Sequence, residues 1–172
     1  MEIFRAANCN YSGKGSCWAC DLESAKAYTD NGMFGGEDLY SAEIDPDGML
    51  DWTGVNYSNF EHSRDVRDAL LHIIKLGKKD EDVAETVVRI CGYSDPDLVN
   101  YIEIDEFQQK FFDRFLGGFN IHDIFDRKEM VDLFGKIWES VSYRDSYPDN
   151  CETVVALRDG AIFNMKKIEK GE

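Results

Sequence analysis

The start of the fold is encoded by residues 3–28, which read IFRAANCNYSGKGSCWACDLESAKAY. The apolar stretch at residues 3–6 predicts a short strand, and the polar, glycine-containing residues 10–15 predict a turn. Residues 16–19 predict a second short strand. Successive strand residues point to opposite faces, so Ser16 and Trp18 are expected on the same face.

A helix is predicted directly after the second strand. Asp21 suits its N-cap, and the helix is expected to run to about Asp30. Glycines at positions 32, 35 and 36 break the chain, and residues 39–44 alternate as a third strand, which ends at an Asp-Pro-Asp-Gly turn. The predicted buried stripe of the helix consists of Leu22, Ala25 and Tyr28.

The middle of the chain has helical periodicity. Ser58 to Glu61 resembles a capping box, and Asp80 suits a second N-cap. A helix at residues 107–115 is suggested by phenylalanines spaced four apart. Asp126 to Glu129 resembles a second capping box. The helix after Ser58 is predicted to bury Val66, Ala69, Leu70, Ile73 and Ile74. The helix capped by Asp80 is predicted to bury Val83, Val87, Val88 and Cys91. The helix after Asp126 is predicted to bury Met130, Leu133, Phe134, Ile137, Trp138 and Val141.

Strands return near the end of the chain, at residues 141–143, 153–157 and 162–165. Strands at both ends with helices between them predict an α+β fold, in which the two ends meet in one mixed or antiparallel sheet. The length suits one domain over residues 1–172, with residues 93–126 as a possible helical insertion. Side chains distant in sequence can therefore form one site.

Composition limits the classes of partner. The net charge of −15 weighs against direct binding of nucleic acid and fits docking on a basic partner, although solubility alone also explains it. No apolar run approaches the length of a membrane helix, and we expect no secretory signal and a cytoplasmic location.

The five cysteines do not indicate a disulfide framework, because their number is odd. Cys17 and Cys20 form a C-x-x-C pair, but no second pair or paired histidines follow at zinc-site spacing. A redox pair would be expected to open a helix, whereas this one follows a loop. We therefore expect packing cysteines on a strand and no metal.

Three groups of residues have side chains that could bind a ligand or act in catalysis. Arg5 lies in an apolar strand and requires an anion or another polar partner if it points inward; a salt bridge or a solvent-facing position is the alternative. Ser16 and Trp18 could hold a ribose and a planar ring, or form an ordinary half-buried strand. The late carboxylates could stabilise positive charge on a sugar, or form an acidic surface loop. They are Asp145, Asp149 and Glu152.

The order of these features resembles the ADP-ribosyltransferases, in particular their Arg-Ser-Glu branch. Gly-Ser-x-Trp-Ala at residues 15–19, followed by Asp-x-x-x-Ala-x-x-Tyr, carries the resemblance. Met1-Glu2-Ile3-Phe4 and Val-Ser-x-x-Asp at residues 141–145 are similar to the phage anti-CRISPR mono-ADP-ribosyltransferases that inactivate a type I-F surveillance complex. Two departures are the Arg at position 5, where that group has His, and the lack of a Glu-x-Glu motif.

The resemblance implies an ADP-ribosyltransferase-like fold, NAD as substrate, and a host protein or CRISPR effector complex as target. It implies Asp145 as the catalytic carboxylate, with Glu152 second. The NAD-contacting residues that it implies are Arg5, Ala6, Ser16, Cys17, Trp18 and Tyr28. Two alternatives remain: a non-enzymatic acidic inhibitor of a basic nucleic-acid-binding surface, and a metal or redox protein that uses Cys17 and Cys20.

Overall fold

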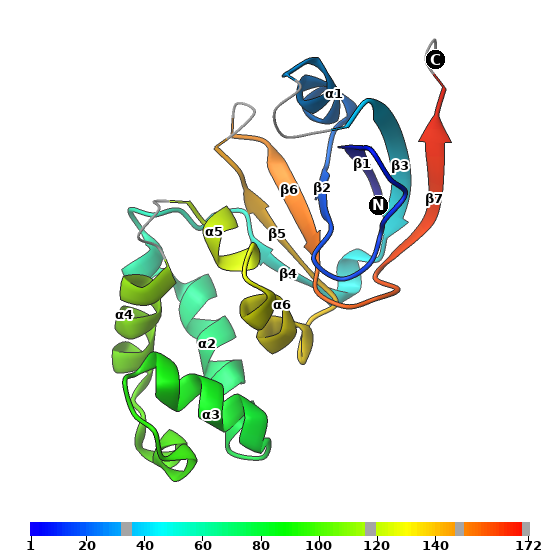
Figure 1. Ribbon diagram of the computed structural model, residues 1–172. Coiled ribbons are helices and arrows are strands. Elements are labelled where there is room, and N and C mark those ends of the chain that lie inside the picture. The colour runs from blue at the N-terminus through cyan, green and yellow to red at the C-terminus, as the bar shows by residue number, and fades with distance from the viewer. Residues whose placement is uncertain (32–35, 116–119, 147–149, 170–172) are drawn as a thin grey trace. The chain divides into compact units, whose positions relative to one another are not determined.

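The computed structural model describes residues 1–31, 36–115, 120–146 and 150–169. The fold is α+β, as predicted, with strands from both ends of the chain in one mixed sheet and helices between them (Figure 1). The strands are β1 (Glu2–Ala7), β2 (Cys17–Ala19), β3 (Asp38–Ile44), β4 (Met49–Trp52), β5 (Ser140–Arg144), β6 (Glu152–Ala156) and β7 (Ile162–Ile168). The helices are α1 (Leu22–Asn31), α2 (Arg64–Gly77), α3 (Glu81–Ile90), α4 (Ile104–Phe115), α5 (His122–Phe125) and α6 (Lys128–Gly135), with 3-10 turns η1 (Pro46–Gly48), η2 (Phe60–His62) and η3 (Pro96–Tyr101).

The strand order of the seven-stranded sheet is β4-β5-β6-β2-β1-β3-β7. The β4–β5 pair is parallel, and the other described pairs are antiparallel. A parallel neighbour requires a long crossover, and the helices between residues 55 and 137 provide it. The pairing of β2 with β6 brings the first forty residues beside the last thirty, as the sequence predicts. The short strand β4 was not predicted.

The chain folds into two compact units. The sheet unit comprises Met1–Gly54 and Trp138–Glu172, and the helical unit comprises Val55–Ile137. The described part of the possible insertion at residues 93–126 belongs to the helical unit. The organisation of residues 1–172 as one domain stays a prediction.

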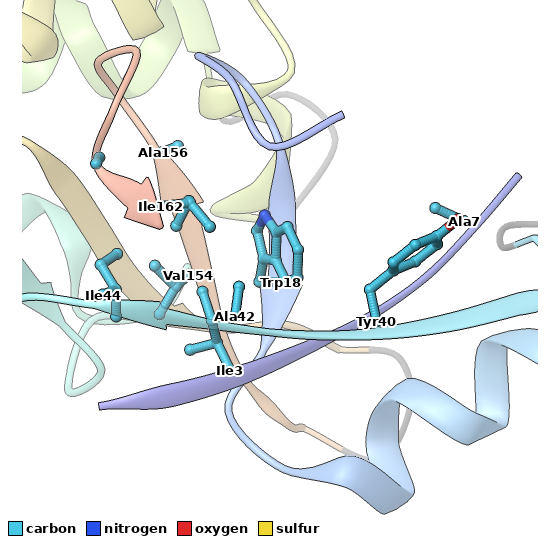
Figure 2. Close-up of a cluster of buried hydrophobic side chains, with 10 residues drawn as sticks. Ile3, Ala7, Trp18, Tyr40, Ala42, Ile44, Val154, Ala156 and Ile162 are labelled. Atoms are coloured by element: carbon cyan, nitrogen blue, oxygen red, sulfur yellow. The ribbon is translucent and has the colours of Figure 1, made fainter. Parts of the chain in front are cut away.

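The core of the sheet unit lies on one face of the sheet. Figure 2 shows its side chains together on the face turned away from α1. The strand β1 contributes alternate residues to it, Ile3 and Ala7, as the period of two requires. The members of this cluster are Ile3, Ala7, Trp18, Tyr40, Ala42, Ile44, Val154, Ala156, Ala161 and Ile162. We call this face the cluster face.

In the helical unit, the predicted apolar stripes of α2 and α3 are buried, and Asp80 caps α3 by accepting a hydrogen bond from the Val83 amide at 3.1 Å. The capping box at Ser58 is wrong. Ser63 caps α2 instead, because Phe60 to His62 form a 3-10 turn that delays the helix.

The capping box at Asp126 is also wrong, because Asp126 ends α5 and α6 begins at Lys128. The helix α6 stops at Gly135, so only the first half of its predicted stripe is helical. Val141 instead lies in β5, where its backbone pairs with Leu50 and Val155. Strand pairing overrides helical periodicity at this position.

Two predictions concern residues that the structure does not describe. The chain break at Gly32 and Gly35 lies outside the described residues, as does the candidate carboxylate Asp149. No helix in the described ranges combines the length and the apolar character needed to cross a membrane.

Candidate functional site

A row of paired residues crosses five strands of the sheet on the cluster face. Trp18 on β2 pairs with Val154 on β6, and Arg5 on β1 pairs with Tyr40 on β3. Tyr40 in turn pairs with Lys167 on β7. Arg5 and Trp18 stand one position along from the Phe4–Ala19 pair, so they too lie opposite each other. Paired residues point to the same face, so Arg5 is the middle residue of this row, in which Val154, Trp18 and Tyr40 are buried in the core of the sheet unit.

Arg5 is half-buried, and its guanidinium contacts two neutral groups. Its carbon Cζ lies 5.8 Å from the centroid of the Trp18 ring, and Nη1 donates to the Tyr11 carbonyl oxygen at 2.6 Å. Within the described ranges no carboxylate pairs with Arg5. A partly desolvated guanidinium without an anionic partner favours the binding of an anion, and its planar fork suits a phosphate. Arg5 therefore forms no salt bridge with a described residue, and the polar partner that it has, the Tyr11 carbonyl oxygen, lies in an exposed position.

Ser16 holds the Trp18 ring, and the Trp18 ring contacts the guanidinium of Arg5. The indole Nε1 donates to Ser16 Oγ at 3.0 Å, and the two side chains are only 2% and 1% exposed. In this conformation they present almost no surface to a ligand. The hydrogen bond between Ser16 and Trp18 fixes the indole ring on which the Arg5 guanidinium lies. These two residues therefore orient Arg5 and do not themselves contact a ligand.

The other predicted NAD-contacting residues lie away from this row. Ala6 pairs with Leu39 and Cys17 pairs with Val155, which places both on the opposite face of the sheet from Arg5. Tyr28 belongs to α1, which packs on that opposite face. Thus the structure joins Arg5, Ser16 and Trp18 and separates them from these three residues.

The two late carboxylates lie at the same end of the β5–β6 hairpin. Asp145 directly follows β5 and is 6% exposed, and its amide donates to the Cys151 carbonyl oxygen at 2.8 Å. Glu152 begins β6, and its carbonyl oxygen accepts a hydrogen bond from the Cys20 amide at 2.9 Å. Glu152 is two positions from Val154 and lies on the cluster face. Asp145 pairs through its backbone with Cys151, whose thiol contacts Ser24 in α1, so Asp145 lies on the opposite face of the sheet from Arg5 and Glu152.

Two thiols report the electrostatics around these carboxylates. Burial raises the pKa of Cys20 to about 12, with a further contribution from the Glu152 carboxylate, to which the thiol is hydrogen-bonded. Burial also raises the pKa of Cys151, and the negative charge of Asp145 acts in the same direction. The hairpin end is therefore an electronegative, partly desolvated environment, in which an acidic group favours a neighbouring positive charge.

A pocket of about 570 Å³ opens at the other end of the row. It lies beside the residues that connect β1 to β2, and Tyr40 forms part of its wall. Of the described residues that line it, Lys167 alone is charged. The lining residues are Cys9, Asn10, Ser12, Tyr40, Met165 and Lys167. Sequence reasoning missed this pocket, because the pairing of β3 with β7 that creates it leaves no local pattern.

The cysteines and histidines do not assemble a metal site in the part of the chain that the structure describes. All five cysteines are free thiols, and Cys91 and Cys151 are buried. The C-x-x-C pair spans β2 and the residue after it, where Cys17 and Cys20 are both partly buried.

No protein-family model matches the chain, and no similar curated protein was found. One solved structure, described as the crystal structure of an anti-CRISPR protein, is similar over 98% of this chain and 95% of that chain. The two share 14% sequence identity with a TM-score of 0.35, so this likeness carries no conclusion about activity.

Proposed function

We propose that this protein is an NAD-dependent mono-ADP-ribosyltransferase that modifies a host protein, and that its target belongs to a CRISPR effector complex. The observation that carries the proposal is the half-buried guanidinium of Arg5, which pairs with no carboxylate of the described residues and lies on the same face of the sheet as Glu152. The proposal thus gives Arg5 the NAD diphosphate and gives a late carboxylate the ribose. The choice of NAD and of the target rests on the sequence resemblance.

The proposed reaction breaks the bond between the nicotinamide ring nitrogen and ribose C1′, and the electron pair leaves with nicotinamide. A nucleophilic atom of the target then bonds to C1′ and loses its proton to solvent. Positive charge develops on the ribose in the transition state, where a carboxylate stabilises it most. The sequence resemblance gives Asp145 as the first candidate, and it is only 6% exposed, but it lies on the α1 face of the sheet, whereas Glu152 shares the cluster face with Arg5. Glu152 is the second.

Arg5 binds the diphosphate of NAD in this proposal. The guanidinium exchanges its neutral partner, the Tyr11 carbonyl, for phosphate oxygens, while the Trp18 ring keeps it in place. Hydrogen bonds between charged partners are roughly twice as strong as neutral ones, which favours this exchange. The deeply buried Ser16 and Trp18 act through Arg5.

The direct test is transfer of labelled ADP-ribose from NAD to a purified type I-F surveillance complex or to proteins of a host lysate. Wild type should label a discrete band. Asp145→Asn should lower transfer roughly a hundredfold or more, the loss typical of removing one electrostatic contact in a transition state. Asp47→Asn removes the same charge from an exposed turn and is the matched control.

Two results would overturn the proposal: no labelling by wild type, or labelling by both the Asp145→Asn and the Glu152→Gln variants that equals labelling by the Asp47→Asn control. If Glu152→Gln abolishes transfer while Asp145→Asn does not, the catalytic role belongs to Glu152.

The net charge of −15 favours a second candidate, a non-enzymatic inhibitor that covers a basic nucleic-acid-binding surface. Such binding should weaken steeply with added salt and be independent of NAD. Inhibition that is unchanged after NAD is removed would favour this candidate over the transferase.

A further inference from the structure

The pocket beside the β1–β2 connection contains a buried polar group that the fold leaves unused. Tyr40, which lines this pocket, is only 8% exposed, and its hydroxyl forms no hydrogen bond with a residue of the described ranges. Figure 2 shows its ring extending along the sheet toward Ala7, where β1 ends and the chain continues into the pocket residues Cys9, Asn10 and Ser12. Because a buried hydroxyl without a partner costs free energy, the Tyr40 hydroxyl favours a ligand that accepts its hydrogen bond.

The second donor in this pocket is Lys167, which pairs with Tyr40 across β3 and β7. Its Nζ lies 2.8 Å from Asp38 Oδ2, but the lysine side chain is 57% exposed, so its ammonium has further donors for a ligand. The hydrogen bond to Asp38, and the nearby Asp38 and Tyr40 oxygens, raise the pKa of Lys167, which is therefore a cation at neutral pH. A hydroxyl and an ammonium that line one pocket suit an oxyanion.

The Asp38 carboxylate restricts which oxyanion fits. Lys167 and Asp38 together carry no net charge, and the protein as a whole carries −15. A phosphate dianion would therefore meet about twice the repulsion that a carboxylate monoanion meets. The partly buried Met165 adds an apolar wall, and the volume of about 570 Å³ lies in the range of small-molecule pockets.

We propose that the pocket lined by Tyr40, Met165 and Lys167 binds a small organic carboxylate. The carboxylate oxygens accept hydrogen bonds from the Tyr40 hydroxyl and the Lys167 ammonium, and the apolar part of the ligand contacts Met165. Asn10 and Ser12, which also line the pocket, offer hydrogen bonds to its other polar groups. This site needs neither NAD nor the proposed transfer reaction.

Titration of the full chain with benzoate, benzyl alcohol and phenyl phosphate tests the site, because the three probes share a ring and differ in charge. Isotope-labelled methionine methyl groups report binding by NMR, with Met165→Leu used to assign the Met165 signal. Benzoate should shift the Met165 signal saturably and leave the signal of Met130, in helix α6, unchanged. Benzyl alcohol should cause little shift, and phenyl phosphate should bind more weakly than benzoate.

Tyr40→Phe separates binding from folding, because it removes only the hydroxyl. It should raise the Kd for benzoate about tenfold or more and leave the midpoint of urea unfolding unchanged, since the free protein loses no hydrogen bond. Lys167→Gln should weaken benzoate binding to a similar extent. Lys166→Gln is the matched control, because it makes the same charge change on the same strand but pairs with Ser41 on the other face.

Asp38→Asn tests the charge argument, and its expected effect is opposite in sign to general damage of the fold. Removing this carboxylate should tighten the binding of both anions, and should tighten phenyl phosphate more than benzoate.

Three results would overturn the carboxylate site: a Met165 shift with benzoate no larger than with benzyl alcohol, benzoate binding that either Tyr40→Phe or Lys167→Gln leaves unchanged, or tighter binding of phenyl phosphate than of benzoate. Saturable benzoate binding that both variants weaken, and that Lys166→Gln does not, supports it. These titrations contain no NAD, so failure of the transferase proposal would leave the site unaffected.

Discussion

Arg5 and Trp18 stand opposite each other on neighbouring strands, with the guanidinium carbon 5.8 Å from the centroid of the indole ring. The contact orients a cation whose other polar partner is a backbone carbonyl. Cation–π contacts contribute about 0.5–2 kcal/mol, which is enough to hold the side chain in one place but not enough to replace an anion.

Arg5→Lys tests whether the planar fork is needed. The substitution keeps the charge but loses bidentate binding of a phosphate, so we expect the Kd for NAD to rise about tenfold or more. Calorimetry with NAD measures this directly. Arg64→Lys changes an exposed arginine at the start of α2 and should leave the Kd unchanged. An Arg5→Lys variant that binds NAD like wild type would show that Arg5 does not hold the diphosphate.

Ser16→Ala tests the support beneath Arg5. The substitution leaves the buried Trp18 Nε1 without its acceptor, which should lower the free energy of unfolding by about 1–3 kcal/mol. Urea denaturation with an unchanged m-value provides the measurement. Ser41→Ala, at a partly buried serine on β3, should stay within about 0.5 kcal/mol of wild type. Equal stability of the two variants would mean that the Ser16–Trp18 hydrogen bond contributes little.

The sequence predicts individual strands of this fold better than it predicts which strands pair with each other. The apolar stretch at residues 3–6 and the alternation at residues 39–44 predict β1 and β3, because each strand has its own local pattern. It does not show that Tyr40 pairs with both Arg5 and Lys167, since those pairings join residues 35 and 127 positions apart. The pocket therefore could not be predicted, whereas the shared face of Ser16 and Trp18 could.

Sequence rules for helix capping also fail where two nearby residues could each be the N-cap of the same helix. Ser58 and Ser63 both precede the apolar stripe of α2, and the capping-box spacing favours Ser58. The structure selects Ser63, whose Oγ accepts from the Val66 amide at 3.4 Å, while Ser58 Oγ donates to Asn56 Oδ1. Packing of Phe60, which is fully buried, places the 3-10 turn and thereby the start of the helix.

This choice of cap is testable with a matched pair of substitutions. Ser63→Ala should lower the free energy of unfolding by about 0.5–2 kcal/mol, the usual cost of losing an N-cap. Ser58→Ala should change it by less than about 0.5 kcal/mol, because Ser58 caps no helix in the described structure. Thermal or urea unfolding followed by circular dichroism distinguishes them. A larger loss for Ser58→Ala would restore the capping box that the sequence suggests.

The reactivity of the Cys20 thiol reports the environment of the nearby carboxylate of Glu152. Burial and the adjacent Glu152 carboxylate raise its pKa to about 12, above the usual value of about 8.5. The thiolate is the form that reacts, so at pH 8 Cys20 should be alkylated on the order of a thousandfold more slowly than a thiol with the usual pKa. Mass spectrometry of iodoacetamide-treated protein measures this, with the exposed Cys9 as internal reference.

Glu152→Gln removes one of the charges that oppose ionisation of Cys20. The pKa of Cys20 should fall while staying above the usual value, because burial is the larger cause and persists. Its alkylation should accelerate, and the pH at which it becomes fast should move down. Glu43→Gln, an exposed position on β3, should leave the rate unchanged. Equal rates in the Glu152 and Glu43 variants would mean that Glu152 does not face Cys20, and would remove Glu152 from the candidate catalytic carboxylates.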